Sequence, residues 1–196
     1  MNQQFVQAIN REVASLPEGF FSTFRYTTTG NNLCHPLTLG AIAGVVGGLP
    51  GVAHIAIDVR LNDMRGGKFQ PDVVGYDQNL HPVVVVDYES PNSSDARVPV
   101  KDWLPFAQWR AASGRETPYL VVTTLPQRGS PEWELRWTAS GQYNHEFSGQ
   151  RDKIRRSPFE FWYRHYRSVA PQYDLRGVCM VNIDDGLASM VPIDGI

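Results

Sequence analysis

Three carboxylates stand at the ends of two predicted strands that are neighbours along the chain. Asp72 follows Pro71, whereas Asp87 and Glu89 follow a run of four valines. A β-branched run of this kind predicts a strand that is buried on both faces. Residues two apart on a strand share a face, so Asp87 and Glu89 are expected to meet Asp72 from the adjacent strand. Because clustered carboxylates repel unless a cation or protons compensate them, the pattern indicates a site for a hard metal ion.

Each of these acids also has a purely structural interpretation. A Pro-Asp pair commonly begins a turn, and Asp72 alone fits that use. Asp87 and Glu89 fit solvated residues at the end of a strand. The four valines directly before them favour a site, because they place the pair at the rim of a core strand.

The elements before and around these acids are predicted from periodicity and turn residues. Apolar residues at helical spacing predict a helix from Phe5 to Leu16, and a short second helix is expected within Leu37 to Val46. Three strands are expected at Val52 to Leu61, Phe69 to Tyr76 and Pro82 to Tyr88. Their short connections predict an antiparallel meander.

A helix and a fourth strand should complete this core. Asp102 is a suitable N-cap for a helix from Trp103 to Ser113, and Gly114 is suited to close it. The next strand, Tyr119 to Leu125, should lie parallel to the third because a helical crossover joins them. Further elements are predicted at Trp133 to Trp137 (strand), Ser157 to Val169 (helix), and Val178 to Ile183 with Leu187 to Ile193 (hairpin). We therefore expect one α/β domain over residues 1–196, with a core at about 50–126 and a C-terminal strand, helix and hairpin at about 127–196.

Composition narrows the class of protein. The chain has 196 residues and a formal net charge of −2, which argues against a polycationic nucleic-acid coat. Cys34 and Cys179 form no metal-binding spacing, so a reducing compartment is expected. The N-terminus lacks a signal-peptide pattern, and the apolar stretch Leu37 to Ile57 is interrupted by glycines and Pro50. We expect a cytoplasmic protein that is not inserted in a membrane.

Residues 50 to 126 resemble the PD-(D/E)XK restriction-endonuclease-like superfamily and, within it, the Uma-type family. The matching pieces are Pro71-Asp72, the segment from Asp87 through Ser93 that contains Ser90-Pro91, and then Asp95 and Lys101. The order of predicted elements also fits, since the superfamily core is a helix, a three-strand meander, a helix and a strand. The resemblance therefore implies an α/β fold with a restriction-endonuclease-like core.

The same resemblance implies metal-dependent hydrolysis of phosphodiesters, with DNA as the expected substrate. Asp72, Asp87 and the backbone carbonyl of Tyr88 would bind Mg²⁺ or Mn²⁺, which activates water and stabilises charge on phosphate. The chain departs from the motif at Glu89, where lysine is usual. Glu89 would then act as a general base or bind a second metal ion, and Lys101 would supply the missing positive charge. If neither does so, the protein is an inactive nuclease-fold module that binds nucleic acid or serves assembly.

Contacts with nucleic acid are expected at two places. The Ser90 hydroxyl and Asn92 amide either shape their loop or hold a phosphate or a water molecule. The segment 151–167 has six Lys or Arg and two acidic residues. Its arginines are Arg151, Arg155, Arg156, Arg164 and Arg167, of which the last four are the candidate phosphate contacts. A solvated basic face explains them equally well, and a homodimer is an arrangement that the sequence leaves open.

Three other features have weaker interpretations. Glu12 fits a solvated position on the first helix, although related nucleases sometimes supply a metal ligand from such a helix. His54 and Asp58 are four apart on a predicted strand and should share a face, yet they lack a third ligand. Cys34 beside His35 allows a thiol hydrolase, but neighbours in sequence often point apart.

Overall fold

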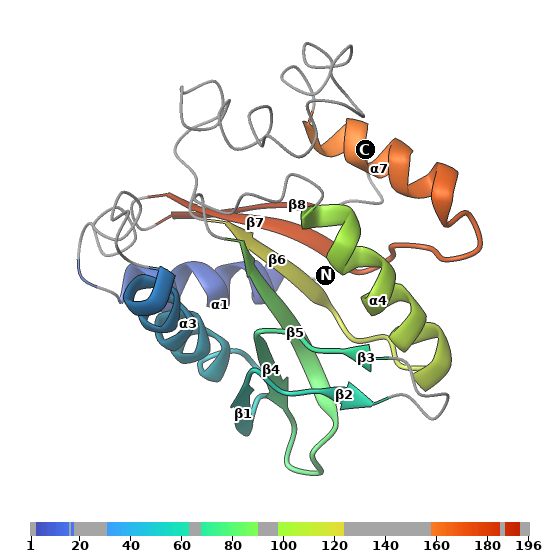
Figure 1. Ribbon diagram of the computed structural model, residues 1–196. Coiled ribbons are helices and arrows are strands. Elements are labelled where there is room, and N and C mark those ends of the chain that lie inside the picture. The colour runs from blue at the N-terminus through green and yellow to red at the C-terminus, as the bar shows by residue number, and fades with distance from the viewer. Residues whose placement is uncertain are drawn as a thin grey trace.

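The predicted meander forms one half of a mixed six-stranded sheet with the order β1-β4-β5-β6-β7-β8 (Figure 1). The computed structural model describes residues 3–15, 17, 31–62, 68–89, 98–123, 158–184 and 187–192. The strands of this sheet are β1 (His54–Ile57), β4 (Val73–Tyr76), β5 (Pro82–Glu89), β6 (Tyr119–Thr123), β7 (Val178–Asp184) and β8 (Leu187–Pro192). Strands β1, β4 and β5 are antiparallel, β5, β6 and β7 are parallel, and β8 returns antiparallel to β7. The antiparallel meander and the parallel fourth strand are thus confirmed.

Helices cover both faces of the sheet. On one face lie α1 (Gln3–Ala14) and α3 (Asn31–Gly47), and on the other lie α4 (Val98–Ser113) and α7 (Pro158–Val169). Because side chains alternate along a strand, the sheet divides the apolar core in two. Val84, Val86 and Tyr88 of β5 pack with α3, whereas Val85 packs with α4. The predicted α/β class is confirmed at this level.

The first two predicted strands are wrong in extent, because the chain leaves the sheet between them. β1 ends at Ile57, and residues 58–72 carry a separate two-stranded ribbon formed by β2 (Leu61–Asn62) and β3 (Lys68–Phe69). Leu61 and Phe69 are buried in the core on the α4 side. Apolar residues alternate in the sequence as far as Leu61. However, Leu61 belongs to the ribbon, which forms a second layer on the α4 side of the sheet.

The helices also begin earlier than predicted. α3 starts at Asn31 and includes Pro36, while α4 starts at Val98 and contains Asp102 inside the helix, so the predicted N-cap at Asp102 is wrong. Pro99 lies in the first turn of α4, where a missing N–H costs little. α7 begins at Pro158 and ends at Val169 as predicted, and the C-terminal hairpin is confirmed. The predicted strand 133–137 and the cap Ser157 lie outside the described residues.

Aromatic side chains join α4 to α7. Trp103 and Tyr166 are fully buried and meet edge to face, with ring centroids 5.9 Å apart. Burial raises the pKa of Tyr166 to about 12. Among the described residues, neither the Tyr166 hydroxyl nor the Trp103 indole N–H has a hydrogen-bond partner.

Arg110 fixes α4 to the segment that follows α7. Its buried guanidinium donates to the backbone carbonyls of Asp174 and Arg176 and to the Asp174 carboxylate, and it lies 5.5 Å from the ring centroid of Phe106. Burial acts to raise the pKa of Asp174, but hydrogen bonds from Arg176 and the Arg110 charge outweigh it, so the pKa lies below its ordinary value. Within the described part of the chain, no helix is both long and apolar enough to cross a membrane.

Candidate metal-binding site

Asp72 and Asp87 lie opposite each other where β4 begins and β5 approaches its end. Val73 pairs with Val86, so these two acids occupy the next position of the same register. The Asp72 N–H donates to Asp87 Oδ1 at 2.9 Å, and the Tyr88 N–H donates to Asp72 Oδ2 at 2.7 Å. Each carboxylate therefore accepts a hydrogen bond from the backbone of the other strand. The predicted proximity of the two acids is confirmed.

Tyr119, the first residue of β6, donates its hydroxyl to Asp87 Oδ2. Its ring is fully buried, stacked on Phe106 with centroids 4.5 Å apart and edge to face with Phe69 at 5.9 Å. The phenol is thus held rigidly against the carboxylate. Sequence reasoning missed this residue, because a tyrosine at the start of a strand is an ordinary core residue until the parallel pairing of β5 with β6 is known.

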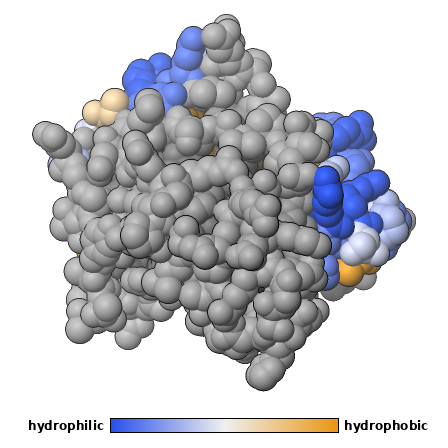
Figure 2. Space-filling model, turned by 90° about the horizontal axis from the view of Figure 1, so that it is seen from above, coloured by the Kyte–Doolittle hydropathy of each residue, from blue (hydrophilic) through white to orange (hydrophobic). Residues whose placement is uncertain are grey.

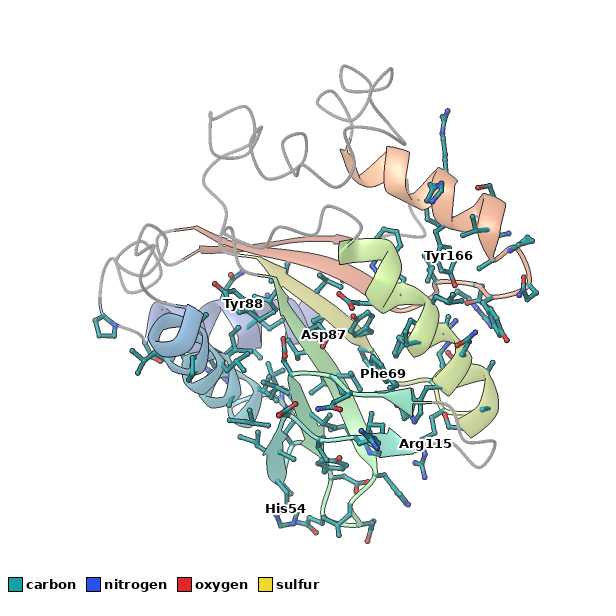
Figure 3. The ribbon with its side chains drawn as sticks, viewed as in Figure 1. His54, Phe69, Asp87, Tyr88, Arg115 and Tyr166 are labelled. Carbon is teal, nitrogen blue, oxygen red and sulfur yellow. The ribbon has the colours of Figure 1, made fainter. Side chains whose placement is uncertain are left out.

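Burial makes these donors necessary. Asp87 is 8% exposed and lies on the α4 side of the sheet, whereas the neighbouring Tyr88 side chain lies on the α3 side (Figure 3). A buried carboxylate that lacked hydrogen-bond donors would be strongly destabilising. Within the described part of the chain, the donors to Asp87 include the Tyr119 hydroxyl and the backbone N–H of Asp72 itself. The arrangement therefore allows two neighbouring acids to be accommodated at the edge of an apolar core.

For two other predicted site residues, the structure describes the backbone alone. Glu89 is the last residue of β5 and is paired with Thr123 of β6. Lys101 is the fourth residue of α4, the helix on the same side of the sheet as Asp87. The side chains of Glu89 and Lys101 fall outside the described part of the structure, and so do residues Ser90 and Asn92 entirely.

Of the predicted basic contacts, Arg164 and Arg167 lie on α7 and are exposed. The Arg167 guanidinium donates to the carbonyl of Tyr173 at 3.3 Å. Hydrophilic residues gather on the side of the molecule where α7 lies (Figure 2). This helix covers the same face of the sheet as α4, which is the side on which the buried Asp87 side chain lies. Arg155 and Arg156 lie outside the described residues.

The residues with weaker interpretations lie elsewhere. Glu12 forms an ion pair with Arg11 at 3.0 Å and lies against Gly48, the residue after α3. His54 is exposed on β1, but Asp58 follows the end of that strand with a φ of 53°, so the prediction that they share a strand face is wrong. Cys34 lies in α3 with its side chain outside the described part, whereas Cys179 is buried in the α3-side core.

The donor set fits a hard cation only in part. Mg²⁺ in proteins takes one or two carboxylates and completes its shell with water and phosphate oxygens, which Asp72 and Asp87 allow. Each carboxylate oxygen has two lone-pair sites, so an oxygen that accepts one hydrogen bond keeps a second site for a metal ion. Among the described side chains, no group of three or more His, Cys, Asp or Glu is close enough to hold a metal. A third side-chain ligand would have to come from a residue such as Glu89, whose side chain lies outside the described part.

Comparison with known proteins adds no relative to these observations. No protein-family model, no curated protein and no solved structure matches the chain.

Proposed function

We propose that this protein is a Mg²⁺- or Mn²⁺-dependent phosphodiesterase of the PD-(D/E)XK type that acts on DNA. The observation that carries the proposal is the meeting of Asp72 and Asp87 across β4 and β5. Two acids that the motif predicts, fifteen positions apart in sequence, accept hydrogen bonds from each other's strand at one point on the α4 side of the sheet.

The topology supports the same proposal. β5 pairs antiparallel with β4 and parallel with β6, so the acids lie at the strand where the sheet changes type. Ligand sites in open α/β sheets are commonly found beyond the carboxyl ends of the parallel strands, and Asp87 lies near that end of β5. The order of a three-strand meander, a helix and a parallel strand is also that of the restriction-endonuclease-like core. Both features favour a site at this end of β5.

Each residue would have a defined role. Asp72 and Asp87 would bind the metal ion with the carbonyl of Tyr88, and Tyr119 would hold Asp87 in one orientation. Bound Mg²⁺ or Mn²⁺ would supply an acidified water and offset charge on the scissile phosphate. Glu89 would take a proton from the attacking water, and Lys101, near the start of α4, would offset phosphate charge. Arg164 and Arg167 would contact the DNA backbone without base preference.

One observation favours a second candidate, an inactive module of the same fold that binds nucleic acid. The hydrogen bonds to Asp72 and Asp87 come from groups of the protein itself, and they join β4, β5 and β6. Such a network stabilises the sheet whether or not a cation binds. With Glu89 in place of the usual lysine, the network would then be structural and the arginines of α7 would carry the function.

Metal binding and cleavage distinguish the two candidates. We expect the wild-type protein to bind Mn²⁺ in calorimetry and to nick DNA with Mn²⁺ present. Asp72→Asn and Asp87→Asn should each lower the cleavage rate by about a hundredfold or more, because each removes an anionic ligand of the metal ion that activates the water. Asp174→Asn, which makes the same chemical change in the segment after α7, outside the proposed site, should leave cleavage unchanged.

Retained cleavage in either site variant would refute the assignment. DNA binding by the wild-type protein without detectable binding of Mn²⁺ would favour the inactive module instead. Circular dichroism of each variant should establish that it is folded, since Asn at position 87 keeps only one of the two side-chain oxygens that accept hydrogen bonds there.

A further inference from the structure

Asp58 has a backbone conformation that side chains rarely adopt. Its φ of 53° lies in the left-handed region, one residue after the last residue of β1. Residues other than glycine are strained there, although Asp and Asn tolerate the region better than most. Strain of this kind persists only where the surrounding structure requires it, and it is concentrated at functional sites.

Two hydrogen bonds define the surroundings of Asp58. Its N–H donates to the carbonyl of Asp72 at 2.8 Å, and its Oδ1 accepts from Gln70 Nε2 at 2.6 Å. Asp58 and Gln70 are the two ends of the segment that leaves the sheet to form β2 and β3. The side-chain hydrogen bond therefore closes this segment at its base, directly beside Pro71 and Asp72.

The backbone of Asp72 is consequently held on both sides. The N–H of Asp58, just after β1, donates to the Asp72 carbonyl, and the Asp87 carboxylate on β5 accepts the Asp72 N–H. With both peptide groups fixed, the Asp72 carboxylate can move only by rotation about its own side-chain bonds. This is the condition for accepting the Tyr88 N–H and for facing a ligand in one orientation.

Stability alone does not account for this arrangement. Asp58 and Gln70 are both exposed, and an exposed hydrogen bond contributes little net free energy. The strain of a left-handed aspartate costs a similar amount, so the two about cancel. The ribbon is already held by Phe69, which packs against Phe106 and Tyr119. We therefore infer that the Asp58–Gln70 hydrogen bond serves to fix the position of the chain at Asp72.

We propose that Asp58, through its hydrogen bond with Gln70, is a positioning residue that fixes Asp72 against Asp87. Its consequence for metal binding rests on the proposed function, whereas its effect on the geometry of Asp72 does not. The role differs from that of a ligand, because the Asp58 carboxylate binds Gln70 and its backbone N–H binds Asp72.

Amide hydrogen exchange of the metal-free protein tests the geometric part. Asp58→Gly removes the carboxylate but adopts a φ of 53° without strain, and Gln70→Ala removes the donor. In both variants we expect the Asp72 and Tyr88 amides to exchange about tenfold faster, while the core amides of β5 exchange at the wild-type rate. Asp58→Asn keeps an oxygen acceptor and tolerates the same φ, so it should restore wild-type rates. Gln108→Ala, on the exposed side of α4, is the matched control.

Wild-type exchange at Asp72 and Tyr88 in both Asp58→Gly and Gln70→Ala would overturn the proposal. Equal acceleration at all β5 amides would also overturn it, because that result means a general loss of stability. Calorimetry with Mn²⁺ then tests the consequence for the site. We expect Mn²⁺ to bind about tenfold more weakly to Asp58→Gly and to Gln70→Ala, and to bind Asp58→Asn with wild-type affinity. If the wild-type protein binds no Mn²⁺, the proposed function fails, while the exchange rates still decide the role of Asp58.

Discussion

Replacing Tyr119 with Phe removes a single hydroxyl from the candidate site. The ring keeps its stacking on Phe106 and its edge contact with Phe69, so the change isolates the hydrogen bond to Asp87 Oδ2. The variant leaves a buried carboxylate with one donor fewer. Since Asp87 is only 8% exposed, water cannot readily replace that donor.

The expected loss follows from the charge on the acceptor. Hydrogen bonds to ionised groups contribute about 1.5 to 3 kcal/mol to the free energy of unfolding, roughly twice the value for neutral pairs. For a protein of this size, 1 kcal/mol corresponds to a change in Tm of about 2 to 4 °C. Tyr119→Phe should therefore lower Tm by about 3 to 12 °C.

Tyr166→Phe is the matched control. It makes the same chemical change at another fully buried tyrosine, whose hydroxyl has no hydrogen-bond partner among the described residues. Removing a buried hydroxyl that lacks a partner should stabilise the protein by about 1 kcal/mol, because its desolvation cost disappears. The two substitutions are thus expected to have opposite signs.

Urea denaturation at neutral pH, followed by circular dichroism, measures both free energies. An unchanged slope with urea concentration would show that the variants unfold from comparable native states. If Tyr119→Phe stays within about 0.5 kcal/mol of the wild type, or if both variants change stability equally, the phenol does not hold Asp87 in the way described.

Two further substitutions test other parts of the fold. Arg110→Ala should destabilise the protein by about 2 kcal/mol or more, since it removes a buried cation that binds the segment after α7. Arg110→Lys should recover part of this loss in the same urea experiment. The backbone N–H of His81, aided by that of Asn79, holds the pKa of Asp77 below its ordinary 3.8. Its contribution to stability is therefore present above about pH 4 and is lost as the pH falls through the lower folded value, so Asp77→Asn should reduce the acid slope of the unfolding free energy.

Local patterns predicted most of the sheet. The valine run identified β5, and the short turns around it identified the antiparallel meander, because adjacent strands with short connections have few alternatives. The crossover helix then required β6 to lie parallel to β5. These predictions rest on chain connectivity, which the sequence contains.

The predicted ends of elements were wrong where tertiary contacts, rather than the local sequence, determine where a strand or helix stops. The pattern of Val52 to Leu61 fits a single strand, and nothing local shows that the chain turns out of the sheet at Asp58. Asp102 has the chemistry of a helix cap, but α4 begins four residues earlier, at Val98. At Asp58, the packing of Leu61 and Phe69 in a second layer overrides a valid local signal.

The candidate site divides in the same way. Asp72 and Asp87 could be predicted to meet because a meander brings their ends together. Tyr119 and Gln70 could not, since their contacts with Asp87 and Asp58 depend on the strand register and on a left-handed backbone. The acids of a site are thus easier to find than the residues that hold them.

The turn at Asp58 also bears on aggregation. β1 is an edge strand of the sheet, and its exposed side chains include Ile55 and Ile57. A long, flat, apolar edge is a template on which strands of other molecules can add. By sending the chain out of the plane after four residues, Asp58 keeps this edge short. The residue that we propose orients an acid within the site would therefore also limit the pairing of one molecule with the next.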